Sequence, residues 1–158
     1  MAYHDDLLAH ALALAHKSPA TQADFRRAVS AAYYALFHLL ISETIANWNL
    51  DSSRAALGRM FEHSSMKKAS SRVSDLKLFP FRGEEPSLVD SLRLVAESFV
   101  QLQDRRHIAD YDCARAWTRT QTQMQVQVAE LAFLSWQAIR HERIAQDYLV
   151  SLLIKQRD

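Results

Sequence analysis

The sequence predicts an all-α protein: an up-and-down antiparallel bundle of four to five helices that ends in a long C-terminal helix. Three observations support this fold class. The chain has only two glycines and three prolines in 158 residues, so long stretches contain no helix breaker. Its large apolar residues recur at steps of three and four, which is the period of a helix buried on one face. Hydrophobic residues make up 49% of the chain, which is enough for the core of one domain.

The helix predicted over residues 24–48 is the one around which the other helices should pack. Its large apolar side chains follow the helical period: Phe25, Val29, Tyr33, Leu36, Phe37, Leu40, Ile41, Ile45 and Trp48. Alanines lie between them: Ala28, Ala31, Ala32 and Ala35. Small side chains let neighbouring helices approach closely, so we expect this helix in the middle of the bundle.

Three other helices are predicted before the last one. The first covers residues 2–17 and ends at Ser18-Pro19, because Pro disfavours the helical conformation in the residue before it. A third helix is predicted over residues 52–72, followed by a loop over residues 73–86 that contains two prolines and a glycine. A fourth begins near Ser87 and has a regular amphipathic face.

The last helix is predicted over residues 118–155, where neither Pro nor Gly occurs. Within it, residues 120–128 (TQTQMQVQV) alternate polar and apolar, a pattern that alone favours a strand; we expect helix, because a lone strand has no partner. So long a helix should overrun the bundle or break near residues 140–143, and its final part should fold back or pack on another subunit. We therefore expect one domain, with its core at about residues 20–140 and a C-terminal helical extension at about residues 141–158.

Composition excludes several classes of protein. The formal net charge of +1 does not by itself indicate nucleic acid or a membrane as partner. The single cysteine, Cys113, excludes an intramolecular disulfide and a cysteine metal cluster. Two glycines, Gly58 and Gly83, are too few for a dinucleotide-binding or P-loop fingerprint. No apolar run approaches the roughly 20 residues of a membrane span, and the N-terminus lacks a secretory signal. We expect a cytoplasmic protein with no membrane association, no metal and no cofactor.

The segment over residues 52–72 is the most basic part of the chain. Its cationic side chains and its histidine are Arg54, Arg59, His63, Lys67, Lys68 and Arg72. Two interpretations stay open: a solvated helix face, or a surface that contacts phosphates.

Residues 104–112 form the densest polar cluster. With Leu102 facing inward, Arg105 and Arg106 lie three and four positions further on, toward the same side. Guanidinium groups turned toward a bundle interior need acceptors, and three carboxylates can supply them: Asp104, Asp110 and Asp112.

This polar cluster allows two interpretations. The structural one is a buried lattice of arginines and aspartates that the Tyr111 hydroxyl closes. The functional one is a basic notch that holds a phosphate or an RNA backbone, with His107 as proton donor or acceptor.

Two motifs resemble a known family. Residues 30–38 (SAAYYALFH) resemble the S-x-A-Y-Y-A-x-F-H helix of HEPN-domain proteins. Residues 105–112 (RRHIADYD) are similar to the second motif of small, uncharacterised bacterial and archaeal HEPN proteins, an Arg followed after two or three residues by Ala-Asp-Tyr. The motifs come in the family's order, and with their helices they cover about residues 20–140. The resemblance implies a helical bundle that forms a homodimer, with the polar motifs of two subunits facing each other across a shared cleft.

The resemblance also implies a range of functions. Many HEPN domains are metal-independent endoribonucleases of toxin–antitoxin, CRISPR and abortive-infection systems, and they carry an Arg, four to six residues, and then a His. That spacing is absent here. Counted from Arg105, the positions where the His should stand hold Asp110, Tyr111 and Asp112. Counted from Arg106, they hold Tyr111, Asp112 and Cys113. His107 follows the arginines directly. A carboxylate in place of the imidazole cannot supply its proton and would repel a phosphate.

Three hypotheses follow. The first is a HEPN-type module that binds nucleotide or RNA phosphates in a toxin–antitoxin or defence system. It would form a homodimer and have a minimal nucleotidyltransferase antitoxin as its partner. Tyr111 would be a target for modification by that partner. Its ligand-binding residues would be Arg105, Arg106, Asp110, Tyr111, Tyr33 and Tyr34.

The second is a metal-independent endoribonuclease toxin with a rearranged site. Its catalytic residues would be Arg105, Arg106, His107 and His38, and His63 could enter the same cleft from another helix. The third is a purely structural protein-interaction domain.

Overall fold

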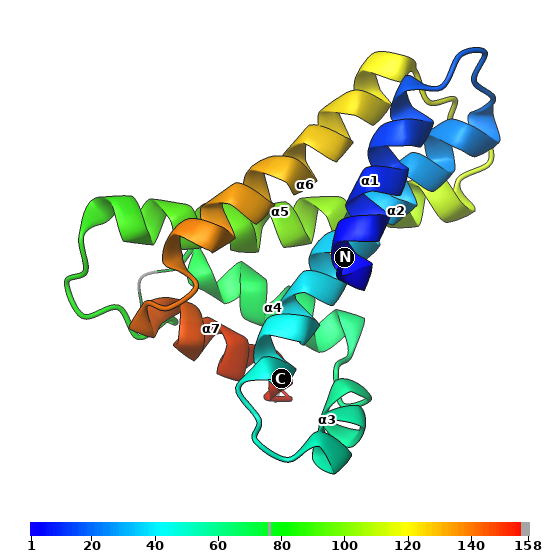
Figure 1. The fold of residues 1–158 in the computed structure, drawn as a ribbon. Coiled ribbons are helices and arrows are strands. Elements are labelled where there is room, and N and C mark those ends of the chain that lie inside the picture. Colours follow the sequence, from blue (N-terminus) through cyan, green and yellow to red (C-terminus); the bar gives the residue numbers. More distant parts are fainter. Residues whose placement is uncertain (76, 156–158) are drawn as a thin grey trace.

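The computed structural model describes residues 1–75 and 77–155, and this part of the chain is all-helical, with no strand. It contains seven helices (Figure 1): α1 (Tyr3–His16), α2 (Gln22–Ala46), α3 (Asp51–Gly58), α4 (His63–Val73), α5 (Pro86–Tyr111), α6 (Arg119–Ile139) and α7 (Arg143–Leu153). The all-α prediction is confirmed.

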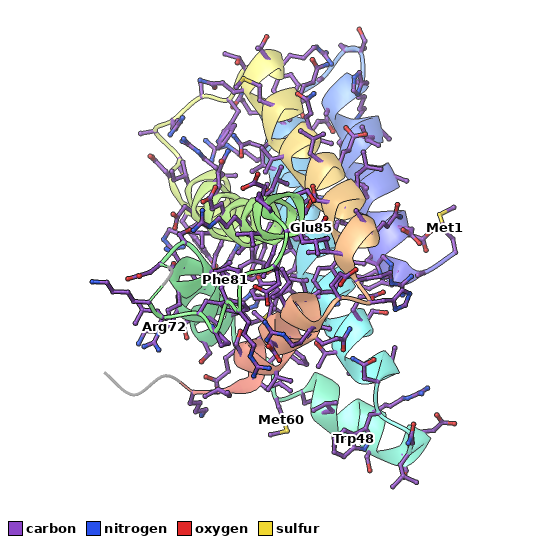
Figure 2. All side chains as sticks on the ribbon, turned by 90° about the vertical axis from the view of Figure 1, so that its left-hand side faces the viewer. Met1, Trp48, Met60, Arg72, Phe81 and Glu85 are labelled. Carbon is purple, nitrogen blue, oxygen red and sulfur yellow. The ribbon has the colours of Figure 1, made fainter. Side chains whose placement is uncertain are left out.

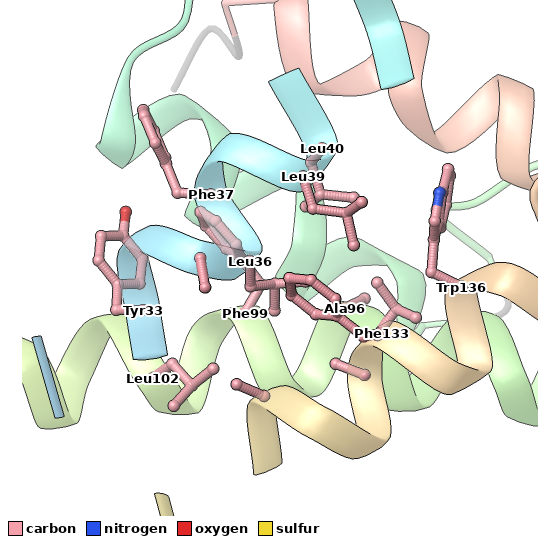
Figure 3. Close-up of a cluster of buried hydrophobic side chains, with 14 of the residues drawn as sticks. Tyr33, Leu36, Phe37, Leu39, Leu40, Ala96, Phe99, Leu102, Phe133 and Trp136 are labelled. Atoms are coloured by element: carbon pink, nitrogen blue, oxygen red, sulfur yellow. The ribbon is translucent and has the colours of Figure 1, made fainter. Parts of the chain in front are cut away.

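Helix α2 is central, as its sequence predicts. It starts with a capping box, in which the Thr21 hydroxyl accepts from the Asp24 amide at 3.2 Å and the Asp24 carboxylate accepts from the Thr21 amide at 2.9 Å. Both groups satisfy amides that the first helical turn leaves without partners. The helix packs against α1, α5 and α6. Leu36 from α2, Phe99 from α5 and Phe133 from α6 meet in the core that Figure 3 shows.

Helices α4 and α7 extend this core on one side. Helix α4 packs against both α5 and α7. The fully buried Tyr148 of α7 places its hydroxyl 2.7 Å from Ser70 Oγ of α4, and Ser70 also donates to the Met66 carbonyl at 2.7 Å. Helix α3 has no buried residue and projects from the body of the molecule (Figure 1).

The described residues contain more helices than the four to five that the sequence predicts, because the chain breaks twice. The single helix expected over residues 52–72 is wrong: α3 ends at Gly58, and α4 begins at His63. Between them Phe61 turns into the core, 9% exposed. The second break separates α6 from α7 and realises one of the two predicted alternatives, a break near residues 140–143 and not a helix that overruns the bundle.

The expected C-terminal extension belongs to the core. Helix α7 folds back onto α4 of the same chain, and its buried residues join the main apolar cluster: Ile144, Ala145, Tyr148, Leu149 and Leu152. That cluster also includes Ala11 and Ala15 of α1. The buried core is therefore wider than residues 20–140.

Helix α2 is, among the described helices, the one long and apolar enough to cross a membrane by length and composition. However, 61% of its most apolar stretch is buried inside the protein. Its apolar side chains therefore already have partners within the bundle.

Candidate functional site

The candidate site lies where α2, α4 and α5 meet. Helix α2 supplies Tyr33, which is fully buried, and the partly buried Tyr34 and His38. Tyr34 and His38 are four residues apart and so lie on one side of the helix, with their ring centroids 6.4 Å apart. Phe37 lies beside both, with its ring centroid 5.2 Å from that of His38 and 6.1 Å from that of Tyr34.

Arg106 of α5 is the cation of this cluster. Its guanidinium carbon lies 5.1 Å from the ring centroid of Tyr33 and 5.7 Å from that of Tyr34, both within the range of a cation–π contact. Asp110, one turn further along α5, has a carboxylate oxygen 3.7 Å from Nη1 of Arg106. This is an ion pair, but too long for a hydrogen bond. The buried Nε of Arg106 has no acceptor among the described residues.

The first residue of α4, His63, closes the cluster. Its Nδ1 lies 2.5 Å from the Tyr33 hydroxyl, and its ring stacks on Phe37 with centroids 4.4 Å apart. Burial raises the pKa of Tyr33 well above its ordinary value, although the nearby Arg106 charge opposes the rise. The hydroxyl therefore keeps its proton at neutral pH and can donate it to Nδ1, which leaves the imidazole proton on Nε2.

Both histidines of the cluster favour the neutral form. Burial lowers the pKa of His63, and the positive charge of Arg106 lowers it further. Burial also lowers the pKa of His38, with smaller contributions from His4 and His63. Tyr3 of α1 covers His38 edge-on at 4.8 Å, so the N-terminal helix forms one wall of the cluster. At pH 7 the cluster therefore combines one fixed cation with neutral imidazoles and phenols.

The turn after α5 is held by α2. Arg26 donates from Nη1 to the carbonyls of Ala109 at 2.8 Å and Asp112 at 2.9 Å, and from Nη2 to the carbonyl of Arg115. These acceptors include carbonyls that the end of a helix leaves unsatisfied. On the neighbouring turn of α2, Ser30 Oγ lies 3.5 Å from the Asp110 carboxylate. The position of Asp110 beside Arg106 is thus fixed from two helices.

The structure brings together four of the predicted ligand residues: Tyr33, Tyr34, Arg106 and Asp110. It separates Arg105 from them. Arg105 lines an open groove of about 650 Å³ between α4 and α5, together with Ser71 and Gln101. The expectation that both arginines turn to the same side is therefore wrong. Neighbouring residues on a helix point about 100° apart, so Arg106 faces the tyrosines of α2 while Arg105 faces the groove.

The predicted residues His107 and Tyr111 lie outside the cluster. They contact each other, with ring centroids 5.0 Å apart, at the exposed end of α5, where Tyr111 is 66% exposed. Of the predicted Arg–Asp lattice, the Arg106–Asp110 pair forms. The other two carboxylates have different partners: Asp104 pairs with Lys67 of α4 at 2.5 Å, and the Asp112 carboxylate accepts from the Ala114 amide at 3.1 Å.

Of the predicted catalytic residues, His38 lies at the edge of the cluster, and His63 is more central than the sequence suggests. The single helix expected over residues 52–72 placed His63 in a helix interior, which hid its position. Gly58, a residue that weakens a helix interior, was the sequence signal for a break before His63.

The described residues contain no group of three or more His, Cys, Asp or Glu side chains that could hold a metal ion. The cluster can instead bind an anion through the Arg106 guanidinium and a neutral imidazole, and it can stack a planar group against Tyr34. Comparisons with protein-family models, with curated proteins and with solved structures find no match to this chain.

Proposed function

We propose that the chain is a HEPN-type module that binds the phosphates of RNA or of a nucleotide, with Arg106 as the main contact. The all-helical structure is consistent with an up-and-down bundle of the HEPN kind. A second observation supports the proposal, because five residues from two helices lie together: Ser30, Tyr33, Tyr34, Arg106 and Asp110. These residues come from the two motifs that resemble the family.

One observation carries the proposal: the Arg106 guanidinium is held in place but not saturated with acceptors. Two tyrosine rings lie within cation–π range of it, its Nε has no acceptor among the described residues, and Asp110 approaches only to 3.7 Å. A phosphate oxygen fits such a guanidinium, because its donors match phosphate geometry. The Nε2 proton of neutral His63 supplies a second donor.

The setting we propose is a cytoplasmic toxin–antitoxin or defence system. The chain acts there as a homodimer whose two clusters face each other, with a minimal nucleotidyltransferase as partner. Tyr111 is exposed at the end of α5, so a modifying enzyme can reach its hydroxyl. Two facing clusters would give a single RNA strand two fixed arginines to contact.

The test compares single arginine variants, because the structure separates the two arginines of the motif. We measure binding of a fluorescein-labelled single-stranded RNA and of ATP to the full chain in EDTA. Arg106→Gln should weaken binding at least about tenfold, the loss expected of a charge-assisted phosphate contact. Arg115→Gln, in the α5–α6 loop, serves as a control for loss of one positive charge and should bind like the parent.

Outcomes distinguish binding from a structural role. Arg106 is only 12% exposed in its side chain, so each variant is also unfolded thermally. If Arg106→Gln melts much lower than the parent and the folded parent binds neither probe, the cluster serves the fold alone. Equal binding by Arg106→Gln and the parent would refute Arg106 as the contact.

A second candidate function, metal-independent RNA cleavage, is favoured by the meeting of His63 with the Arg106 charge. The HEPN nuclease pattern supplies Arg and His from one motif, whereas here α4 contributes the imidazole. The Tyr33–His63 pair could move a proton, and Arg106 could stabilise negative charge in the transition state.

Cleavage of labelled RNA in EDTA, with His63→Gln beside the parent, tests this candidate. The nuclease would be established if the parent cleaves the RNA and the His63→Gln variant still binds the RNA but does not cleave it. Cleavage that both proteins share would indicate a contaminating enzyme.

A further inference from the structure

A second groove of about 440 Å³ lies on another side of the molecule, between α4, α7 and the loop that precedes α5. Its volume falls within the range of ligand-binding pockets, about 300–1,000 Å³. The buried side chains of Ala69 and Phe79 line it. Nothing in the cluster around Arg106 contributes to this groove.

Three large apolar side chains line the groove and are exposed: Leu78 at 56%, Val150 at 59% and Ile154 at 52%. Val150 and Ile154 are four residues apart and so present one apolar edge of α7 and its C-cap. Scattered exposed apolar residues need no explanation, but three that share one concave surface indicate a contact surface for another molecule.

The lining of the groove contains more basic than acidic side chains. Arg72 of α4 and Arg82 of the loop line it, and neither side chain has an acidic partner among the described residues. Figure 2 shows Arg72 extending from the surface. The acidic residue of the lining, Asp147, is already paired with Arg143. An occupant would therefore meet apolar walls and two guanidinium groups that have no acidic partner in the part of the chain that the structure describes.

We propose that this groove binds a peptide segment of a partner protein that carries apolar side chains flanked by Asp or Glu. The apolar side chains would cover Leu78, Val150 and Ile154, and the carboxylates would pair with Arg72 and Arg82. A short amphipathic helix can lay its apolar face in such a groove, and an extended segment can insert alternate side chains. A peptide fits better than a lipid surface, because the apolar side chains line a concavity and do not protrude from a convex face.

The experiment selects peptides from a random library displayed on phage, with the full chain as bait. We expect the enriched peptides to combine apolar residues with Asp or Glu. A synthetic copy of the best one, labelled with fluorescein, is then titrated by anisotropy. Two variants of the groove, Val150→Asp and the Arg72→Glu, Arg82→Glu double variant, should each bind it at least about tenfold more weakly than the parent.

Matched controls exclude general effects of charge and folding. Leu134 on α6 is 62% exposed, so Leu134→Asp makes the same kind of change on another helix and should leave binding unchanged. Arg115→Glu reverses a charge in the α5–α6 loop and should also bind like the parent. Circular dichroism shows whether each variant keeps its helices.

Several outcomes would overturn the proposal. They are a selection that enriches no sequence, enriched peptides without acidic residues, and equal binding by the groove variants. Anionic phosphatidylglycerol vesicles that sediment with the parent but not with Val150→Asp would assign the groove to a membrane surface instead. A concentration-dependent dimer that Val150→Asp abolishes would assign it to a second copy of the chain.

Discussion

Tyr33 shows how closely the core and the candidate site share residues. Its ring is fully buried and packs 5.5 Å from that of Phe99, whereas its hydroxyl meets His63. Arg106 lies over the same ring. A change at Tyr33 therefore alters stability and site together, whereas changes at His63 or Arg106 alter mainly the polar side of the cluster.

The histidines of the cluster should make stability depend on pH. The ordinary pKa of both His38 and His63 is 6.5, and folding lowers it, so below pH 6.5 the unfolded chain binds more protons than the folded one. The free energy of unfolding should therefore fall as the pH drops below 6.5, and this contribution should level off below the folded-state pKa values. Urea unfolding at a series of pH values measures it.

The His38→Gln, His63→Gln double variant should lose part of this dependence on pH. The exposed His141 provides the control, and His141→Gln should follow the parent curve. A double variant with the same slope as the parent between pH 5 and 7 would contradict the assignment to these two histidines.

The buried Ser70–Tyr148 pair should respond unequally to loss of either partner. Tyr148→Phe removes a hydroxyl while Ser70 keeps its bond to the Met66 carbonyl, so we expect a loss of about 1 kcal/mol in the free energy of unfolding. Ser70→Ala leaves the buried Tyr148 hydroxyl without its Ser70 partner and should cost about 1–3 kcal/mol. Urea denaturation of both variants tests the order, and the reverse order would contradict it.

At the scale of elements, the sequence predicts most helices well, because their signals are local. Helices α1, α2 and α5 begin within a residue or two of the predicted positions, and the alternating segment of α6 is helical as expected. The split between α3 and α4 was not predicted. Its cause is tertiary: Phe61 becomes buried, and a periodic pattern does not show where a chain leaves a helix to reach the core.

The candidate site divides in the same way. The two motifs predict that six residues come together, of which the structure brings together Tyr33, Tyr34, Arg106 and Asp110. Arg105 and Tyr111, which belong to the same prediction, lie elsewhere. The approach of His63 depends on how α4 packs, and no local pattern contains that. Helix geometry separates the side chains of Arg105 and Arg106. To predict which of the two faces the cluster, one must also know which residues of α5 form its buried side.

The cap of α6 gives a prediction at the same scale. The Thr118 hydroxyl accepts from the Gln121 amide at 3.1 Å, and the Gln121 side chain accepts from the Thr118 amide at 3.1 Å. Thr118→Ala should lower the free energy of unfolding by about 1 kcal/mol. Thr120→Ala, an exposed position in the same turn, should cost much less. Equal losses in thermal or urea unfolding would show that the cap contributes nothing.

At the scale of the whole molecule, Arg143 joins α7 to the loop before α5. Its guanidinium pairs with Asp147 and Glu84 and lies 3.3 Å from the Pro80 carbonyl, and Glu84 accepts from the Arg82 amide at 2.8 Å. The loop that forms one wall of the groove between α4 and α7 is therefore held against α7 by polar contacts.

Removing this contact should act locally. Arg143→Gln should speed hydrogen exchange at the Arg82 amide, while the global free energy of unfolding changes by less than about 1 kcal/mol, because partly exposed ion pairs contribute little. Hydrogen exchange read by NMR measures both. Arg54→Gln, which breaks the exposed pair with Asp51 on α3, is the control and should leave the loop unchanged. Unchanged exchange in Arg143→Gln would contradict the role.

The return of α7 onto α4 has a consequence for the order of events during synthesis. Helices α1 to α6 can begin to pack as they leave the ribosome, but the part of α4 around Ser70 stays uncovered until residue 148 has emerged. A nascent chain stalled after α6 would therefore expose the apolar side of α4 that α7 otherwise covers. Chaperones that bind exposed apolar segments would meet the protein at this stage, and its release from them would coincide with the docking of α7.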